Sequence, residues 1–534
     1  DILRAGVGRE APRRRGGVRR LPPEGPCPRR RAMGSGLCSG APELGASLEE
    51  EKLGPTPRLV VRQHKFPNDL AGPGPITSSK GSVAHECLLF LEYAKDVPFS
   101  DPLRDFTCQA VSAKSHGHPF VRAWVEQDGA LIGRAAEWPA KSCNEVPSWY
   151  WAQPLGFSLS QHRSSARLRL ELRDQHELLG SLDVPLKDLP EHEPVLRDLT
   201  ETRQWGAPKR TSQVSFQVLD AASVLRERRE VWFIRHGESV WNKAQSQLDL
   251  KTMAERTDHP LSAKGREQAE ALSEKLQLAA NAGSDFDETM ESLFQPDVVY
   301  SSPLTRAIQT SVIALGPTLT CPGRERDMVL MASSREKLNF GGFDTWSTKK
   351  GADIVLGART ELQALYEGEE CCEALKAFNL LGFDAQEVAD NWWCEGMAET
   401  PAQLDARLQE FMSQLLYSPH RSIVVVGHSH FFRSVFKTFL SQEFKEGPEA
   451  KLAKEFAGKK MDNCGVARLE LDPSRGLAGG PIVRAEMVLG SQFVSEEGLL
   501  SCCAAAGQAP ASGQGTSQEQ LVAPTSAERY EAQP

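Results

Sequence analysis

The sequence predicts two folded domains, an all-β sandwich followed by an α/β domain with a three-layer α/β/α architecture. Short segments with apolar residues at every second position recur before residue 222, and this spacing is typical of half-buried strands. After residue 229, apolar strands alternate with segments of helical periodicity, which indicates a parallel or mixed sheet covered by helices. The flanking regions are rich in Pro, Gly, Ser or Ala, as linkers and tails are.

Four segments follow from these patterns. We expect a disordered leader and linker at 1–80, the β-sandwich at 81–222, the α/β domain at 229–490 and a disordered tail at 491–534. The hydrophobic content of 40% in 534 residues is enough to form both cores. No apolar run reaches the length of a transmembrane helix.

Alternating apolar residues mark the strands of the first domain. The alternation is clearest in three leucines, Leu168, Leu170 and Leu172, which would all point to one face of a strand. Turn-forming residues separate these segments, as expected in a β-sandwich. The predicted strands are 106–112, 119–126, 166–172, 182–186 and 212–219.

In the second domain, strands and helices alternate along the chain. Ser262 can cap the helix that follows it. Residues 340–400 have weaker periodicity, and we expect them to form an insert that covers the functional site of this domain. The predicted strands are 231–234, 297–301, 328–331 and 422–427, and the predicted helices are 265–278, 305–315 and 401–416.

Three of these strands end in residues that are costly to bury. Arg235-His236-Gly237 follows the strand at 231–234, Arg306 follows the strand and turn at 297–304, and His428 follows the strand at 422–427. In open α/β sheets, ligands bind at the carboxyl edge of the strands. Two Arg and two His therefore meet at one edge, where they would contact a ligand.

These motifs, in this order, resemble the histidine phosphatase (phosphoglycerate-mutase-like) superfamily over roughly residues 229–490. The resemblance implies the fold of that superfamily and a phosphohistidine intermediate. It also implies His236 as the nucleophile and His428 as a second catalytic histidine. The implied phosphate-binding residues are Arg235, Asn242, Arg306 and Ser429.

The chemistry of these residue types agrees with that reading. A histidine can attack phosphorus only when its imidazole is neutral, and neighbouring cations such as Arg235 and Arg306 lower an imidazole's pKa. The planar guanidinium of Arg binds two phosphate oxygens at once, which Lys cannot do. Since the two Arg and two His supply the charge, we expect no metal or other cofactor.

A phosphatase also needs an acid that protonates the leaving alcohol. The carboxylates between the second and third motifs are Glu325, Asp327, Glu336 and Asp344. Ser334-Arg335-Glu336 best matches the family's Leu-Arg-Glu segment, although Ser334 replaces the usual Leu. We therefore expect Glu336 to be the general acid, which would then activate water against the phosphohistidine.

Hydrolysis of a phosphate ester is the reaction that the sequence favours, with a phosphorylated small molecule or a phosphoprotein as substrate. The first alternative is a phosphoglycerate-mutase-type phosphotransferase. It is disfavoured because 251–256 and 334–337 depart from the segments that carry mutase-specific contacts. The second alternative is a docking domain joined to a weakly active phosphatase that serves as a scaffold, yet no catalytic residue is lost.

The first domain resembles a C2-like domain. His118-Pro119-Phe120-Val121 matches the family's Asp-Pro-Tyr-Val strand, and 144–157 matches its Asn-Pro-x-Trp segment. C2 domains can bind calcium through clustered Asp side chains. Here His118 replaces one Asp, and Gln175-His176 follow Asp174 where a further Asp is expected. The resemblance therefore implies docking to a protein or a membrane without calcium.

Residues 1–32 carry ten Arg, no Lys and three acidic residues, whereas the whole chain has a net charge of −9. A basic leader can act as a nucleic-acid or membrane arm. The acidic remainder argues against nucleic-acid binding. We expect Met33 to be the start of translation, followed by an ordinary flexible leader. The alternative is an acylated start, with myristoylation of Gly34 and palmitoylation of Cys38.

The twelve cysteines form no Cys-x-x-Cys motif, so neither a zinc site nor a disulfide framework is expected. Reduced thiols fit a cytoplasmic protein, which docking through the C2-like domain would bring to a membrane.

Overall fold

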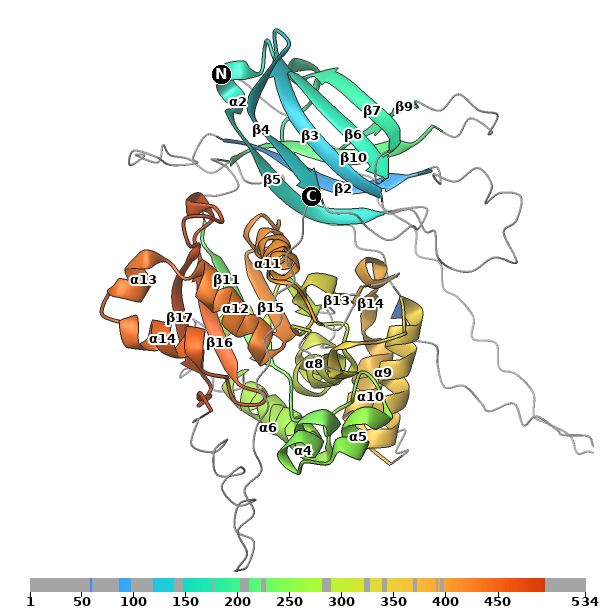
Figure 1. Ribbon diagram of the computed structural model, residues 1–534, viewed down its shortest axis with the longest axis vertical. Helices are drawn as coiled ribbons and strands as arrows, with labels where there is room; N and C mark the ends of the chain where they lie inside the picture. The colour runs from blue at the N-terminus through green and yellow to red at the C-terminus, as the bar shows by residue number, and fades with distance from the viewer. Residues whose placement is uncertain are drawn as a thin grey trace, which may run out of the picture. The chain divides into compact units, whose positions relative to one another are not determined.

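The computed structural model describes these residues: 58–59, 86–97, 119–138, 147–174, 177–201, 211–221, 227–280, 290–320, 327–338, 343–367, 372–389, 392–393 and 398–494. Figure 1 shows the sheets of the β-rich part and the helix-covered sheet of the α/β part. None of the helices in these ranges is both long and apolar enough to cross a membrane.

The first domain is a sandwich of two antiparallel sheets. One has the strand order β5-β2-β10-β8 and the other has the order β4-β3-β6-β7-β9. The strands are β2 (Glu86–Lys95), β3 (Pro119–Gln127), β4 (Ala130–Trp138), β5 (Ser148–Ser158), β6 (Arg167–Asp174), β7 (Glu177–Pro185), β8 (Val195–Asp198), β9 (Thr200–Glu201) and β10 (Gln213–Asp220).

Alternation along the strands builds the core between these two sheets. In β6, Leu168, Leu170 and Leu172 are fully buried, and they lie in one cluster with Val214 and Phe216 of β10. The all-β sandwich is confirmed, as are the strands predicted at 119–126, 166–172, 182–186 and 212–219. The strand predicted at 106–112 lies outside the described residues.

The predicted strands did not include β2, β4, β5, β8 or β9. The segment around Trp149 and Trp151 belongs to β5, and both indoles are 1% exposed. Proline and polar residues hide the alternation there, and the strand is stabilised by its pairing with β2.

The second domain contains an eight-stranded mixed sheet with the order β1-β14-β13-β12-β15-β11-β16-β17. The strands from β1 to β11 in this order are parallel to one another. Strand β16 pairs antiparallel with β11, and β17 pairs antiparallel with β16. Their bounds are β1 (Arg58–Leu59), β11 (Arg229–Arg235), β12 (Val298–Ser301), β13 (Met328–Leu330), β14 (Gly382–Asp384), β15 (Ser422–Gly427), β16 (Val466–Leu471) and β17 (Ile482–Val488).

Helices cover both faces of this sheet. The principal helices are α4 (Val240–Ser246), α5 (Leu250–Glu255), α6 (Ala263–Ala280), α8 (Thr305–Leu319), α9 (Ala352–Leu365), α10 (Glu373–Leu380), α11 (Pro401–Leu416), α12 (Ser429–Phe439), α13 (Gln442–Glu446) and α14 (Ala450–Gly458). Val231 and Phe233 of β11 pack with apolar residues of α11 to α14, whereas Trp232 and Ile234 pack with those of α6, α8, α9 and α10. The predicted three-layer α/β/α sandwich is therefore confirmed.

Two segments differ from the prediction. Arg58–Leu59 lies within the predicted linker, yet it pairs with β14 as an edge strand of the sheet. The region 340–400, predicted as an insert over the site, supplies β14 to the sheet and the helices α9 and α10 to one of its faces. Short apolar runs in both segments are too brief to indicate a strand by periodicity alone.

Candidate active site

The site lies at the carboxyl ends of three neighbouring strands, β11, β15 and β12. Arg235, the last residue of β11, is level with Gly427, the last residue of β15. His236 and His428 are therefore the next residues on adjacent parallel strands. The His236 backbone N–H donates to the carbonyl of Gly427 at 3.0 Å, and the two imidazole centroids are 5.0 Å apart. Strand register alone brings together two histidines that are far apart in the sequence.

Gly237 allows the chain to turn directly after His236. A Cβ atom at Gly237 would lie 2.5 Å from the carbonyl oxygen of Gly265 in α6, and a Cβ at Gly265 would lie 2.0 Å from the carbonyl oxygen of Glu238. These close approaches exclude any larger residue at either position. The two glycines thus fix the turn that presents His236.

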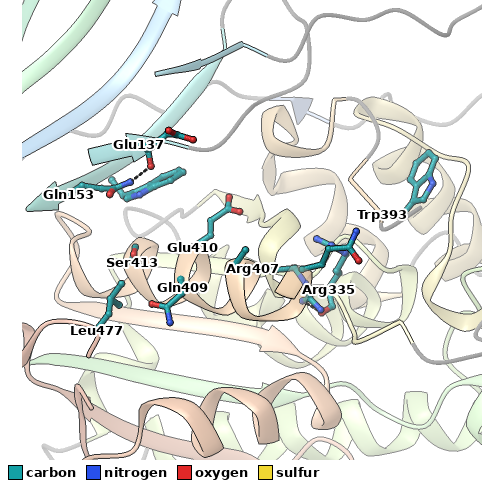
Figure 2. Close-up of a pocket in the computed structure, with 12 residues that line it drawn as sticks. Glu137, Gln153, Arg335, Trp393, Arg407, Gln409, Glu410, Ser413 and Leu477 are labelled. Atoms are coloured by element: carbon teal, nitrogen blue, oxygen red, sulfur yellow. Dashed lines mark hydrogen bonds between the residues drawn. The ribbon is translucent and has the colours of Figure 1, made fainter. Parts of the chain in front are cut away.

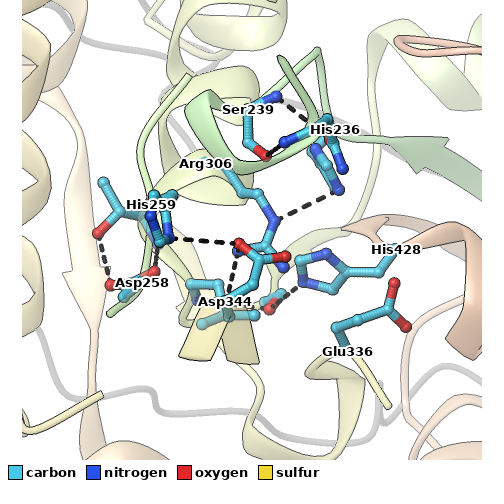
Figure 3. A network of polar contacts seen from close by, with 12 residues as sticks. His236, Ser239, Asp258, His259, Arg306, Glu336, Asp344 and His428 are labelled. Carbon is cyan, nitrogen blue, oxygen red and sulfur yellow. Dashed lines mark hydrogen bonds and ion pairs between the residues drawn. The ribbon is translucent and has the colours of Figure 1, made fainter. Parts of the chain in front are cut away.

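The imidazole of His236 is held in one tautomer. Its Nδ1 lies 2.6 Å from the carbonyl oxygen of Gly237, and because a carbonyl only accepts, Nδ1 carries the proton. Nε2 is then the unprotonated nitrogen, and the Nε–H of Arg306 donates to it at 3.3 Å. Figure 3 shows this contact and the Arg306 guanidinium beside both histidines. Nε2 carries the nucleophilic lone pair, and the Arg306 N–H must move from it to a phosphate oxygen before that lone pair can attack.

Burial and charge keep this imidazole neutral. His236 is 4% exposed. Burial, followed by the positive charges of Arg306 and Arg235, lowers the pKa of His236 well below its usual value. The neutral state required of a nucleophile was predicted from neighbouring Arg; burial, which depends on the tertiary fold, is the larger cause.

Arg306 lies at the start of α8 and is 1% exposed. Asp258 fixes this helix start, because its carboxylate accepts from the Thr305 backbone N–H at 2.8 Å and from the Thr305 hydroxyl at 2.7 Å. This role of Asp258 was not predicted from the sequence. Local pattern could not reveal it, since Thr305 is 47 residues away.

Arg306 also contacts Asp344, which belongs to the short 3₁₀ helix Phe343–Thr345. Its Nη1 donates to the Asp344 carbonyl at 2.9 Å and to the Asp344 carboxylate at 3.0 Å. Asp344 is 8% exposed, and burial raises its pKa to about 6 despite the opposing charge of Arg306. The sequence analysis considered Asp344 only as an alternative acid and did not predict this ion pair.

Arg235 is 8% exposed, and its Nη1 donates to the carbonyl of Met461, which anchors the side chain below the site. Its Nε is buried and has no hydrogen-bond partner. Arg235 therefore has a donor left for an anion.

His428 is fully buried, and its Nε2 lies 2.7 Å from the hydroxyl of Ser302, the first residue after β12. Its Nδ1 is buried without a hydrogen-bond partner. Burial and then Arg306 lower the pKa of His428 well below its usual value. In a neutral imidazole whose Nε2 accepts from Ser302, Nδ1 carries the proton and can donate to a phosphate oxygen. The sequence analysis assigned no role to Ser302, whose partner lies 126 residues away.

Glu336 lies on the His428 side of the site (Figure 3) and is 8% exposed. Its Oε1 accepts from the backbone N–H of Phe431 in α12 at 3.0 Å and from that of Lys337 at 2.8 Å. Asp327, another sequence candidate, is exposed at the amino end of β13, away from the carboxyl edge. Glu325 lies outside the described residues. Glu336 and Asp344 are the sequence candidates that lie within the site.

A buried ion pair, Arg407 with Glu399, stabilises the segment that carries Glu336. Arg407 of α11 donates to the carbonyls of Ser333 at 3.0 Å and Arg335 at 2.8 Å, and its Nε pairs with Glu399 at 2.7 Å. Figure 2 shows Arg335 and Arg407 next to each other. Arg407 is 4% exposed, so these contacts are shielded from water. The chain on both sides of Glu336 is thus pinned to α11.

Two predicted phosphate-binding residues have mainly local contacts. Asn242 and Ser239 form the capping box of α4, in which Asn242 Oδ1 accepts from the Ser239 N–H at 3.3 Å. Ser429 is the first residue of α12 and is buried beside His428. Their contact with phosphate stays a prediction. Among the described residues, no group of three or more His, Cys, Asp and Glu is arranged to hold a metal ion.

Comparison with known proteins agrees with this geometry. Residues 231–325 match the family model of the histidine phosphatase superfamily, branch 1, and the predicted resemblance is confirmed over that range, which includes His236 and Arg306. This supports phosphatase or phosphotransferase activity in general. No curated protein matches the chain.

Several solved structures resemble parts of the chain. Mycobacterial hydrolase 1 is 19% identical, with 49% of this chain and 98% of that chain covered and a TM-score of 0.27. Mycobacterial hydrolase 2 is 20% identical, with coverages of 52% and 98% and a TM-score of 0.27. A C2 domain of plant extended synaptotagmin 1 is 15% identical, with coverages of 26% and 93% and a TM-score of 0.20.

Proposed function

We propose that this chain, in which residues 231–325 match the histidine phosphatase superfamily, is a phosphomonoesterase that hydrolyses its substrate through a phosphohistidine on His236. One observation carries the proposal. His236 Nε2 is an unprotonated, buried nitrogen with the Arg306 guanidinium directed at it, and His428 lies on the neighbouring strand.

In the first step, His236 Nε2 attacks phosphorus, so that an N–P bond forms while the bond from phosphorus to the leaving oxygen breaks. Arg306, Arg235 and the Nδ1–H of His428 bind the three equatorial oxygens, on which negative charge is spread. Glu336 gives its proton to the leaving alcohol oxygen. Asp344 must release Arg306 for this geometry, since phosphate and carboxylate compete for the same guanidinium.

In the second step, the Glu336 carboxylate takes a proton from water, whose oxygen attacks the phosphohistidine. The N–P bond breaks, inorganic phosphate leaves, and His236 and protonated Glu336 are restored. The backbone N–H groups of Phe431 and Lys337 hold the Glu336 carboxylate in place for both proton transfers. Docking of the C2-like domain and a cytoplasmic location stay predictions.

The test is an assay of phosphate release from small phosphomonoesters. The wild-type chain should be active, His236→Ala should be inactive, and Glu336→Gln should be slower by about 10²–10⁴, the usual contribution of a general acid. Arg228→Gln, a change at a 60% exposed side chain, is the control for purification and folding. Full activity of His236→Ala would refute the proposal, and a normal rate for Glu336→Gln would move the acid role to Asp344.

A further inference from the structure

Three basic side chains near Glu336 take no part in the proposed mechanism. His430 and Arg433 lie on the same side of α12, three residues apart, and Lys460 precedes Met461, whose carbonyl holds Arg235. All three side chains are half-buried. We call His430, Arg433 and Lys460 the cationic cluster.

Backbone contacts place this cluster next to the catalytic residues. The N–H of Phe431, which follows His430, donates to Glu336 at 3.0 Å, and the carbonyl of Met461, which follows Lys460, accepts from Arg235. Burial lowers the pKa of Lys460, and the charges of Arg235 and Arg433 lower it further, whereas Glu336 opposes them. Burial also lowers the pKa of His430, which the charges of Glu336, Lys460, Arg433 and Arg235 alter as well. The lowered pKa keeps His430 neutral at pH 7, so Arg433 and Lys460 carry the positive charge of the cluster.

The cluster has no counterion of its own. Among the described residues, no carboxylate pairs with Arg433 or Lys460, and the Nε of Arg433 is buried without a hydrogen-bond partner. Collecting partly desolvated cations without an anion is unfavourable, so such an arrangement indicates a binding site for a negative group.

The position of Glu336 shows which part of a substrate would reach the cluster. Glu336 gives a proton to the leaving oxygen in the proposed function, so the alcohol part of the substrate lies on its side of the site. Arg306 and Asp344 lie on the other side of His428 (Figure 3). The cluster would therefore contact the alcohol part and leave the phosphate bound for transfer to Arg306 and Arg235.

We propose that His430, Arg433 and Lys460 form a second anion-binding subsite, and that the substrate is a small phosphomonoester with a second anionic group, a carboxylate or a second phosphate, on its alcohol part. This inference rests on the proposed function and adds the substrate class. A small molecule fits because the reacting groups are buried: His236 is 4% exposed and Glu336 is 8% exposed.

The test compares matched substrates by their kcat/KM values. 2-Phosphoglycolate and 2-hydroxyethyl phosphate differ in a carboxylate, and 1,3-propanediol bisphosphate and its monophosphate differ in a second phosphate. Wild-type protein should prefer the doubly anionic member of one pair by about 10–100-fold, the effect of one or two charged hydrogen bonds. The pair that shows the preference identifies the second group.

The ratio of kcat/KM for the doubly anionic substrate to kcat/KM for its partner should fall towards one in Lys460→Gln and in Arg433→Gln. Lys460→Arg should retain most of the preference. Lys454→Gln is the matched control, because it makes the same charge change at an exposed position on α14; it should keep the wild-type preference. Turnover without preference in both pairs, or a preference that survives both Gln variants, would overturn this inference alone. No turnover of any substrate would overturn the proposed function and the inference with it.

Discussion

Arg306 donates from one guanidinium nitrogen to both the carbonyl and the carboxylate of Asp344, at 2.9 and 3.0 Å. The same side chain donates from Nε to His236 at 3.3 Å. The carboxylate of Asp344 is therefore placed where an equatorial phosphate oxygen would bind Arg306. This relationship predicts competition between Asp344 and the substrate.

The competition should depend on pH, because burial raises the pKa of Asp344 to about 6. Below pH 6 the neutral carboxyl holds Arg306 weakly, and above pH 6 the carboxylate competes with phosphate. We expect KM to rise above pH 6, by up to about tenfold per pH unit. His236 stays neutral throughout, because its pKa is well below its usual value.

The matched variant is Asp344→Asn, which keeps the shape of the side chain but cannot ionise. The ratio of wild-type KM to variant KM, measured from pH 5 to 8, cancels the ionisation of the substrate itself. We expect this ratio to rise with pH, and a flat ratio would contradict the prediction. Because the folded-state pKa is raised, wild-type stability relative to Asp344→Asn should fall as pH rises through 6.

The phosphorylated intermediate should be a phosphoramidate on His236, labile in acid and stable in base. Arg306→Ala should reduce the rate of its formation by roughly 10²–10³, as expected when one preorganised donor is removed. Glu336→Gln should prolong its lifetime, because water is no longer activated. Rapid quench with labelled substrate, followed by peptide mapping, measures the site, the rate of formation and the lifetime of the intermediate. A label on Ser239, Ser302 or Ser429 would overturn the mechanism.

Arg407 should affect both stability and rate. Arg407→Ala removes the two closest donors to Glu399, whose side chain is 1% exposed, and leaves it the 3.4 Å contact with Arg335, which costs up to about 3–5 kcal/mol in unfolding free energy. The double variant Arg407→Met with Glu399→Leu should recover most of that stability and still lower kcat, because the carbonyls of Ser333 and Arg335 lose their donor.

Urea denaturation and kcat measurements on the same preparations check this prediction. Arg228→Gln breaks an exposed pair with Glu470 and should cost less than about 1 kcal/mol. If the double variant were both stable and fully active, the Arg407 contacts would not be what positions Glu336.

Calcium should neither bind the chain nor change its thermal stability. Of the Asp positions expected for a C2 calcium site, only Asp174 is retained, and calcium needs about six to eight oxygen ligands. Thermal unfolding in 1 mM calcium and in EGTA should give the same Tm within about 1 °C, because an ion that does not bind the folded chain cannot stabilise it. A calorimetric titration that showed micromolar calcium binding would refute this prediction.

Much of the fold follows from the sequence itself. The alternation of Leu168, Leu170 and Leu172 specifies one face of β6, and the apolar runs before His236 and His428 specify buried strands. Periodicity is a local property, so it can be read without knowledge of the partner strand. It failed for β5, where Pro154 and polar residues interrupt the pattern and pairing with β2 defines the strand.

The sequence by itself determined the reacting residues, because Arg235, His236, Arg306 and His428 follow strands or turns in motifs that are contiguous in the chain. Only the tertiary structure placed the Asp344 carboxylate on Arg306, the Ser302 hydroxyl on His428 and the start of α12 on Glu336. The physical reason is that burial and ion pairing depend on which segments the sheet and helices bring together. Contacts of this kind leave no periodic signal in the sequence.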